Sequence, residues 1–182
     1  MKNYNNYPVF VADQVLTAEH LNQVRDYLEE ETRLTRNKLI GIGVVCGFEL
    51  KVDDAEADEI MVTKGCGVTS EGYLMTQDSN IKYTHYRDYS LPEYFSPEHK
   101  AYNGIEDSEG SEVGFYELLP GEAYDDSQEI EEAFLKDKIV VLLLERKETP
   151  LKNCIELDCE DKGDRVEFDL KTLLVKPDWL NK

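Results

Sequence analysis

The chain has 182 residues, with 39 acidic against 20 basic side chains and a formal net charge of −19 at pH 7. This charge argues against nucleic-acid binding, which relies on Lys and Arg to neutralise phosphates, and against binding to anionic membranes. No apolar run is long enough to cross a bilayer, and the N-terminus lacks the apolar core of a signal peptide. We therefore expect one domain over residues 1–182, kept in the cytoplasm or exported without an N-terminal signal.

The first predicted element is a long charged helix that begins at Thr17. The Thr17 hydroxyl can accept a hydrogen bond from a free amide of the first turn. Leu21, Val24 and Leu28 recur at helical spacing and form one apolar stripe, while the remaining faces are charged. Such a pattern predicts an amphipathic helix that packs on a sheet.

An alternating strand follows the helix. Asn37 or Gly41 can supply the left-handed residue that ends the helix. Apolar and polar residues then alternate from Val44 to Val52, which predicts one strand with one buried face. An acidic turn reverses the chain into residues 60–64, so we expect a β-hairpin with a long loop.

Two cysteines fall on this hairpin and its continuation. If Val52 pairs with Ile60, the paired residue numbers sum to 112, and the same register places Cys46 opposite Cys66. In a reducing cytoplasm we interpret this pair as two small buried thiols.

The other two cysteines, Cys154 and Cys159, are separated by four residues. A zinc site wants four ligands, commonly with tighter spacing, and the histidines lie far away in sequence. The spacing favours a surface loop, which a disulfide could close after release, over a metal site.

No catalytic or cofactor motif is present. The glycine-rich segment 64–75 has neither phosphate-loop spacing nor a helix after it, so residues 70–72 are interpreted as a tight turn. The chain lacks GxSxG, HExxH and the EF-hand pattern. We expect a protein that is not an enzyme, with no catalytic, cofactor-binding or metal-binding residues.

A tyrosine-rich patch lies in the middle of the chain. Tyrosine is enriched in protein interfaces, so Tyr86, Tyr89 and Tyr94 are candidate contact residues. The alternatives are a cover for the sheet edge or a carbohydrate- or peptide-binding module. The patch comprises Tyr83, His85, Tyr86, Tyr89, Tyr94, Phe95 and Tyr102.

Residues 101–137 hold 12 acids and one base, Lys136. We interpret this segment as a solvated acidic insertion within the domain. A surface for a basic partner or a cation is the sharper alternative.

The last third predicts further strands. The continuous apolar run 138–145 indicates a strand buried on both faces, placed centrally in the sheet. Residues 128–136 are compatible with a short helix, and residues 166–171 alternate as a strand. Residues 177–180 are expected to begin a helix at the end of the chain, which would fit the head of a longer architecture or a shortened member of it. The predicted fold is α+β: a mostly antiparallel β-sheet with one long N-terminal helix and an acidic insertion.

Several segments together resemble one family. These are VFVADQVLTAEHLNQVRDYLEEETRLTRNKLIGIGVVCGFEL, IMVTKGCGVTSEGYLM, LLLERKETPLKNCIELDC and VEFDLKTLLVKP. They resemble proteins encoded beside phage-tail-like contractile injection systems, especially in Bacteroidetes, in which this region is similar to an N-terminal module of larger structural proteins. These are scaffold motifs, and no catalytic residues come with them.

The resemblance implies a structural or assembly component, such as a baseplate or tail accessory protein. Its partners would be other protein subunits of the particle, in multiple copies within a symmetric assembly. It would assemble in the cytoplasm and become extracellular when particles are released. Docking could use the sheet edge or the charged face of the long helix, where Glu29, Arg33 and Arg36 are the candidate interface residues.

Overall fold

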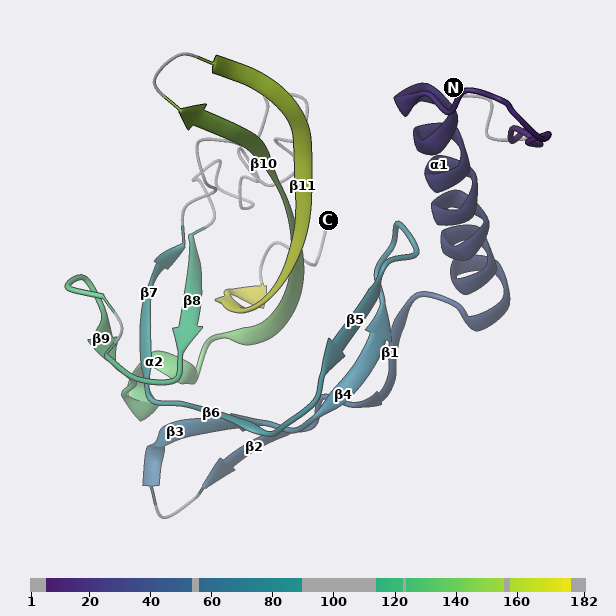
Figure 1. Cartoon of the computed structure of the whole chain (residues 1–182). Coiled ribbons are helices and arrows are strands. Elements are labelled where there is room, and N and C mark those ends of the chain that lie inside the picture. The colour runs from purple at the N-terminus through teal and green to yellow at the C-terminus, as the bar shows by residue number, and fades with distance from the viewer. Residues whose placement is uncertain (1–5, 54–55, 90–113, 123, 156–157, 178–182) are drawn as a thin grey trace. The chain divides into compact units, whose positions relative to one another are not determined.

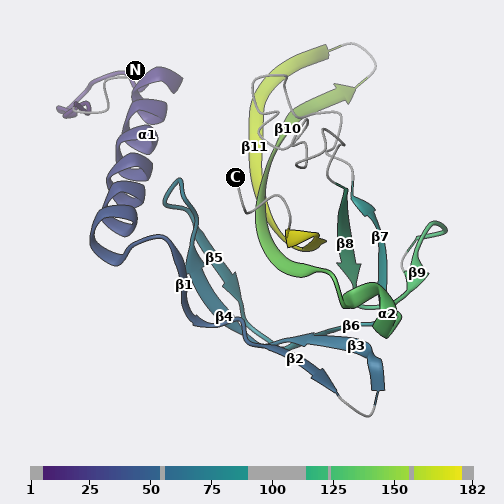
Figure 2. The ribbon, with the colours of Figure 1, turned by 180° about the vertical axis from the view of Figure 1, so that it is seen from behind.

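The computed structural model describes residues 6–53, 56–89, 114–122, 124–155 and 158–177. The chain divides into two compact units, where the sequence predicts one domain. Unit 1 comprises Met1–Phe48 and Gly65–Thr76, and unit 2 comprises Glu49–Lys64 and Gln77–Lys182. Figures 1 and 2 show the elements of each unit from opposite sides. The α+β class, with one long N-terminal helix and mostly antiparallel sheets, is confirmed.

Helix α1 (Ala18–Thr35) begins as predicted, because the Thr17 hydroxyl accepts from the His20 amide at 3.3 Å. A π-helical turn over Arg36–Ile40 continues the helix. The chain then leaves the helix at Gly41, whose φ of 100° suits a residue without a Cβ. The Gly41 amide donates to the carbonyl oxygen of Arg36 at 3.0 Å, which closes the last turn.

Unit 1 also contains a three-stranded sheet in the order β1-β4-β5. These strands are β1 (Gly43–Gly47), β4 (Gly65–Val68) and β5 (Leu74–Gln77). The predicted tight turn joins β4 to β5, with the Gly72 amide donating to the Thr69 carbonyl at 2.9 Å. Strand β1 pairs antiparallel with β4, and Cys46 lies opposite Cys66, as the register sum predicts.

The prediction of one strand from Val44 to Val52 is wrong. The chain forms β1 and then β2 (Leu50–Asp53), which belong to different sheets in different units. Gly47 and Phe48 both adopt positive φ, 66° and 55°, which breaks the extended backbone between them. The expected buried face is absent as well, since Val44, Cys46 and Val52 are exposed.

Unit 2 begins with a three-stranded sheet in the order β2-β3-β6. It contains β2, β3 (Glu56–Val62) and β6 (Ile81–Tyr83). The predicted hairpin register is confirmed, because Val52 pairs with Ile60. Strand β3 begins at Glu56, inside the segment predicted as turn.

The second sheet of unit 2 has five strands in the order β10-β11-β8-β7-β9. They are β7 (His85–Tyr89), β8 (Phe115–Leu119), β9 (Gln128–Glu129), β10 (Ile139–Ile155) and β11 (Asp158–Val175). Figure 1 shows β10 and β11 as a long curved hairpin.

The acidic segment 101–137 is not an insertion over its whole length. Residues 101–113 lie outside the described residues, but residues 115–119 form β8, the middle strand of the five. Leu118 and Leu119 are buried. The charge pattern misleads here because a buried acid, Glu117, alternates with these apolar residues and is neutralised by cations from neighbouring strands.

Two further expectations about this sheet are corrected. Strand β10 lies at the edge of the described sheet rather than at its centre, and it runs through Pro150 to Ile155. An edge strand tolerates proline because one side of it needs no amide donors. The expected helix over 128–136 is shorter, namely α2 (Glu132–Leu135), and it follows β9.

The two sheets of unit 2 share a core. The Tyr83 hydroxyl of β6 lies 2.9 Å from the Thr172 hydroxyl of β11, and both residues are buried. The buried apolar residues of unit 2 are Ile60, Val62, Tyr83, Leu118, Leu119, Ile130, Leu173, Leu174 and Val175. Among the described residues, no helix is both long and apolar enough to span a membrane.

Candidate docking surfaces

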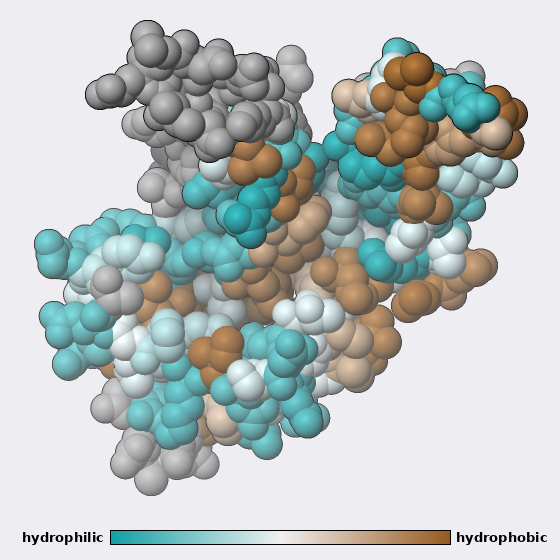
Figure 3. Space-filling view, in the orientation of Figure 1, coloured by the Kyte–Doolittle hydropathy of each residue, from teal (hydrophilic) through white to brown (hydrophobic). Residues whose placement is uncertain are grey.

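Unit 1 exposes far more apolar surface than it buries. Its described residues include two buried apolar side chains, Val68 and Met75, against fifteen exposed large hydrophobic ones. Figure 3 shows such side chains in brown over the N-terminal segment and α1. A unit of this size buries a small share of its surface and is only marginally stable alone. The exposed apolar surface therefore marks unit 1 as the part of the molecule suited to contact another protein.

The apolar stripe of α1 forms the floor of a shallow groove of about 570 Å³. Leu21 and Leu28 are 56% and 57% exposed, so the stripe does not pack on a sheet as the sequence predicts. None of the residues of α1 is buried. Since a helix in water derives most of its stability from packing of its apolar face, this stripe calls for a covering surface. The groove is lined by Leu21, Val24, Arg25, Leu28, Glu29, Thr32, Arg33, Arg36 and Tyr73.

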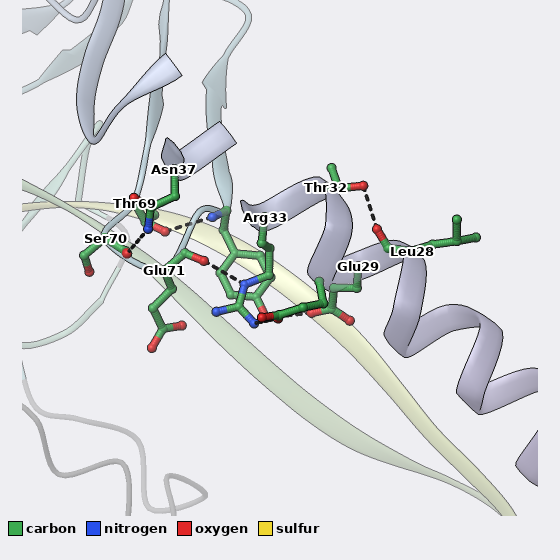
Figure 4. A network of polar contacts seen from close by, with 10 residues as sticks. Leu28, Glu29, Thr32, Arg33, Asn37, Thr69, Ser70 and Glu71 are labelled. Atoms are coloured by element: carbon green, nitrogen blue, oxygen red, sulfur yellow. Dashed lines mark hydrogen bonds and ion pairs between the residues drawn. The ribbon is translucent and has the colours of Figure 1, made fainter. Parts of the chain in front are cut away.

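Two of the three helix residues predicted as interface charges are engaged inside unit 1 (Figure 4). The Tyr73 hydroxyl donates to the Glu29 carboxylate at 2.6 Å. Arg33 Nε donates to the carbonyl oxygen of Glu71 at 2.7 Å, and its guanidinium lies 4.6 Å from the centre of the Tyr73 ring. These contacts fasten α1 to the β4–β5 turn. Arg36, the third residue, lines the groove.

Gly72 allows this attachment, and Gly72→Ala is expected to weaken it. At φ +86°, a Cβ would lie 2.4 Å from the Arg33 carbonyl oxygen, which only a backbone shift could relieve. That shift would also pull on the bond from Asn37 to the Ser70 carbonyl. We expect unit 1 to lose about 2 kcal/mol, seen as faster amide hydrogen exchange in α1.

Gly121→Ala is the matched control for Gly72→Ala, because a Cβ there meets open space. Equal exchange rates in the two variants would show that the turn does not hold the helix.

The tyrosine-rich patch does not form one surface in the part that the structure describes. Tyr83 is buried in the core, and Tyr86 stacks on Phe134 with ring centres 3.8 Å apart. The Tyr86 hydroxyl also donates to Gln128 at 2.9 Å. Tyr89 donates to Glu145 instead. Tyr94, with Phe95 and Tyr102, lies outside the described residues.

Unit 2 contains an open polar cavity of about 750 Å³ that sequence reasoning missed. One of its lining residues is Glu117, whose side chain is 6% exposed. Arg87 of β7 has a guanidinium nitrogen 2.6 Å from this carboxylate, and Lys171 of β11 has its ammonium nitrogen 2.8 Å from it. The strand register brings these three side chains together. Arg87 pairs with Glu117, and Glu117 pairs with Leu173, two residues from Lys171 on the same face of β11. The cavity is lined by Arg87, Asp88, Tyr89, Glu117, Asp126, Glu145, Lys147, Glu167, Phe168, Asp169 and Lys171.

This network makes unit 2 sensitive to alkaline pH. Burial alone would lower the pKa of Lys171, but hydrogen bonds and charge from Glu117 and Asp169 outweigh it and raise that pKa well above 10.5. Burial raises the pKa of Tyr83 above 10.0. A pKa raised by folding contributes stability that is present below the ordinary pKa and lost above it. We therefore expect the free energy of unfolding to fall once the pH passes these ordinary values.

Urea titrations at neutral pH and above the ordinary lysine pKa measure that fall. In Lys171→Met the fall is expected to be smaller, because one of the contributing groups is gone. A fall of the same size in the variant and the wild type would contradict this origin.

The described residues offer no set of His, Cys, Asp or Glu side chains arranged to hold a metal ion. The chain matches no protein-family model and no curated protein sequence. The chemistry of the two surfaces is therefore what bears on function: an uncovered apolar groove in unit 1 and a charged cavity in unit 2.

Proposed function

We propose that this chain is a non-enzymatic structural component of a phage-tail-like contractile injection particle, which docks to neighbouring subunits through unit 1. The observation that carries the proposal is the apolar stripe of α1, in which Leu21 and Leu28 are exposed and Val24 is half-buried. In this proposal, the identity of the particle rests on the family resemblance of the same segment. Assembly takes place in the cytoplasm, and release of whole particles brings the protein outside the cell.

The geometry of α1 supports docking through apolar contact rather than through free surface charge. Glu29 and Arg33 already bind the β4–β5 turn. Leu21 and Leu28 line the same groove as Arg25 and Arg36, so a partner would meet apolar side chains with charged ones beside them. Protein interfaces commonly have this arrangement, with the binding energy concentrated at the apolar centre.

Purification of intact particles from the producing cells tests the proposal. We expect mass spectrometry to find this chain at a constant ratio to the tube and sheath subunits across gradient fractions. An abundant cytoplasmic protein of the same cells serves as the control and should fall away. Loss of the chain from particles that keep tube and sheath would overturn the proposal.

A second candidate function is binding of a basic peptide in the unit 2 cavity. Six acids and three bases line this cavity, together with Tyr89 and Phe168. The excess of acids favours a cationic ligand. Carbohydrate stacking is less well supported, since Phe134 covers one face of Tyr86. Calorimetry with a Lys-rich peptide and an acidic control peptide distinguishes this function: no heat from the first would remove it.

A further inference from the structure

Two cysteines of unit 1 face each other across neighbouring strands. Cys46 of β1 pairs with Cys66 of β4, and their sulfur atoms lie 3.5 Å apart within a thiol hydrogen bond. Cys46 is exposed and Cys66 is half-buried, so a small oxidant can reach the pair. The expectation of two buried thiols is therefore wrong. A disulfide bond is about 2.0 Å long, and a small rotation of the two side chains would bring the sulfurs together.

The backbone around the pair is built for close approach. Cys66 lies between Gly65 and Gly67 of β4. Each of these glycines lies so close to the backbone of β1 that a Cβ would not fit. A Cβ on Gly65 would lie 2.7 Å from the Cys46 carbonyl oxygen, and one on Gly67 would lie 2.9 Å from the Gly43 carbonyl oxygen. The glycines flanking Cys66 thus hold β1 against β4 at the level of the thiols.

The position of the pair along the chain gives it a distinct consequence. The chain leaves unit 1 after Phe48 and returns at Gly65, so Cys46 and Cys66 bracket the hairpin of β2 and β3. A disulfide between Cys46 and Cys66 would close a covalent loop that contains this hairpin. It would also fix β1, the strand that follows α1, in a unit with two buried apolar side chains among its described residues.

The same arrangement recurs in unit 2. Cys154 of β10 pairs in register with Cys159 of β11 near the end of their hairpin. All four cysteines of the chain therefore lie opposite another cysteine on an antiparallel neighbour. Cysteine stands opposite cysteine in two separate antiparallel strand pairs, which points to positions suited to oxidation.

We propose that Cys46 and Cys66 form a redox-active dithiol site that closes to an intramolecular disulfide and clamps β1 to β4. The oxidant is a small disulfide such as oxidised glutathione. One cysteine thiolate attacks it, releasing one reduced thiol and leaving a mixed disulfide. The second cysteine then displaces the remaining glutathione thiol, so the pair loses two protons and two electrons and the oxidant gains them. The site belongs to the state of the protein after it leaves a reducing compartment.

Intact-mass measurement of the full chain after incubation with oxidised glutathione tests this proposal. Cys154→Ser and Cys159→Ser are introduced together so that only the unit 1 pair reports. We expect loss of two hydrogen atoms, a proteolytic peptide linking Cys46 to Cys66, and no bound glutathione. In the further variant Cys46→Ser, Cys66 should instead retain one glutathione, since the displacing thiol is missing. Two free thiols, or stable glutathione on both cysteines of the pair, would overturn the proposal.

A second readout separates clamping from mere proximity. Oxidation is expected to slow amide exchange in β1 and to raise the midpoint of thermal unfolding of unit 1 by about 5 °C, and dithiothreitol should reverse both. The Cys46→Ser chain, treated in the same way, should show neither change. A disulfide that forms without slowing exchange in β1 would overturn the clamping role.

Discussion

Replacement of Glu117 by Gln is expected to lower the free energy of unfolding of unit 2 by about 3 kcal/mol. The side chain of Glu117 is 6% exposed and forms ion pairs with both Arg87 and Lys171. An amide of the same size removes the ion-pair partner of Arg87 and leaves Lys171 with the exposed carboxylate of Asp169. Breaking a fully buried ion pair costs about 3–5 kcal/mol, and we expect the lower end because both cations keep some access to water. Urea unfolding at neutral pH, followed by the signal of unit 2, measures the loss.

Asp169→Asn is the matched control for Glu117→Gln, because Asp169 also contacts Lys171, at 2.9 Å. Its side chain is 64% exposed, so its removal should change stability by no more than about 0.5 kcal/mol. Similar losses in the two variants would mean that burial does not give Glu117 its importance.

The replacement Leu28→Glu is expected to remove the protein from assembled particles while leaving its fold intact. Leu28 is exposed within the groove of α1, so a carboxylate there costs the free protein little. Against an apolar partner, the same carboxylate would be buried without a counter-charge. Loss of a central interface side chain costs about 2 kcal/mol or more, which corresponds to roughly 30-fold weaker association. The amount of the chain retained per particle measures this effect.

Leu34→Glu supplies the control on the same helix with the same exchange. Leu34 is also exposed, but it does not line the groove, and at about 100° per residue it lies about 120° around the helix from Leu28. It should remain in the particle at the wild-type ratio. If both variants are retained equally, the groove is not the docking face.

Local sequence patterns predicted the elements whose causes are local. The cap at Thr17 and the helix that follows it depend on hydrogen bonds and side-chain spacing within a few residues. The register of the hairpin follows from pairing arithmetic, which also placed Cys46 opposite Cys66. Once one pair of residues is aligned in an antiparallel ladder, the pairing of its neighbours is determined. A single correct pair therefore predicts the register of the following pairs.

The features that the sequence missed depend on distant partners. The alternation from Val44 to Val52 is typical of one strand, because Gly47 falls at a polar position of the pattern. The positive φ of Gly47 cannot be recognised from that pattern. Likewise Glu117 looks like one more solvated acid until β7 and β11 bring Arg87 and Lys171 beside it.

The candidate interface could be predicted only in part. Helical spacing identified the stripe of Leu21 and Leu28, but periodicity cannot tell whether a face is covered by the same chain or left for another. Charge spacing on the helix selected Glu29 and Arg33, whose partners come from a turn about forty residues later in the chain. The apolar groove, rather than those charges, is accordingly the surface to test.

Photo-crosslinking from position 28 inside assembled particles tests most directly whether this chain docks through α1. A photoreactive side chain replaces Leu28 in one preparation and Leu34 in another, and the particles are purified before illumination. We predict a crosslink from position 28 to another subunit of the particle and a much weaker one, or none, from position 34. Particles that contain the protein but yield no crosslink from position 28 to any other subunit would contradict the account.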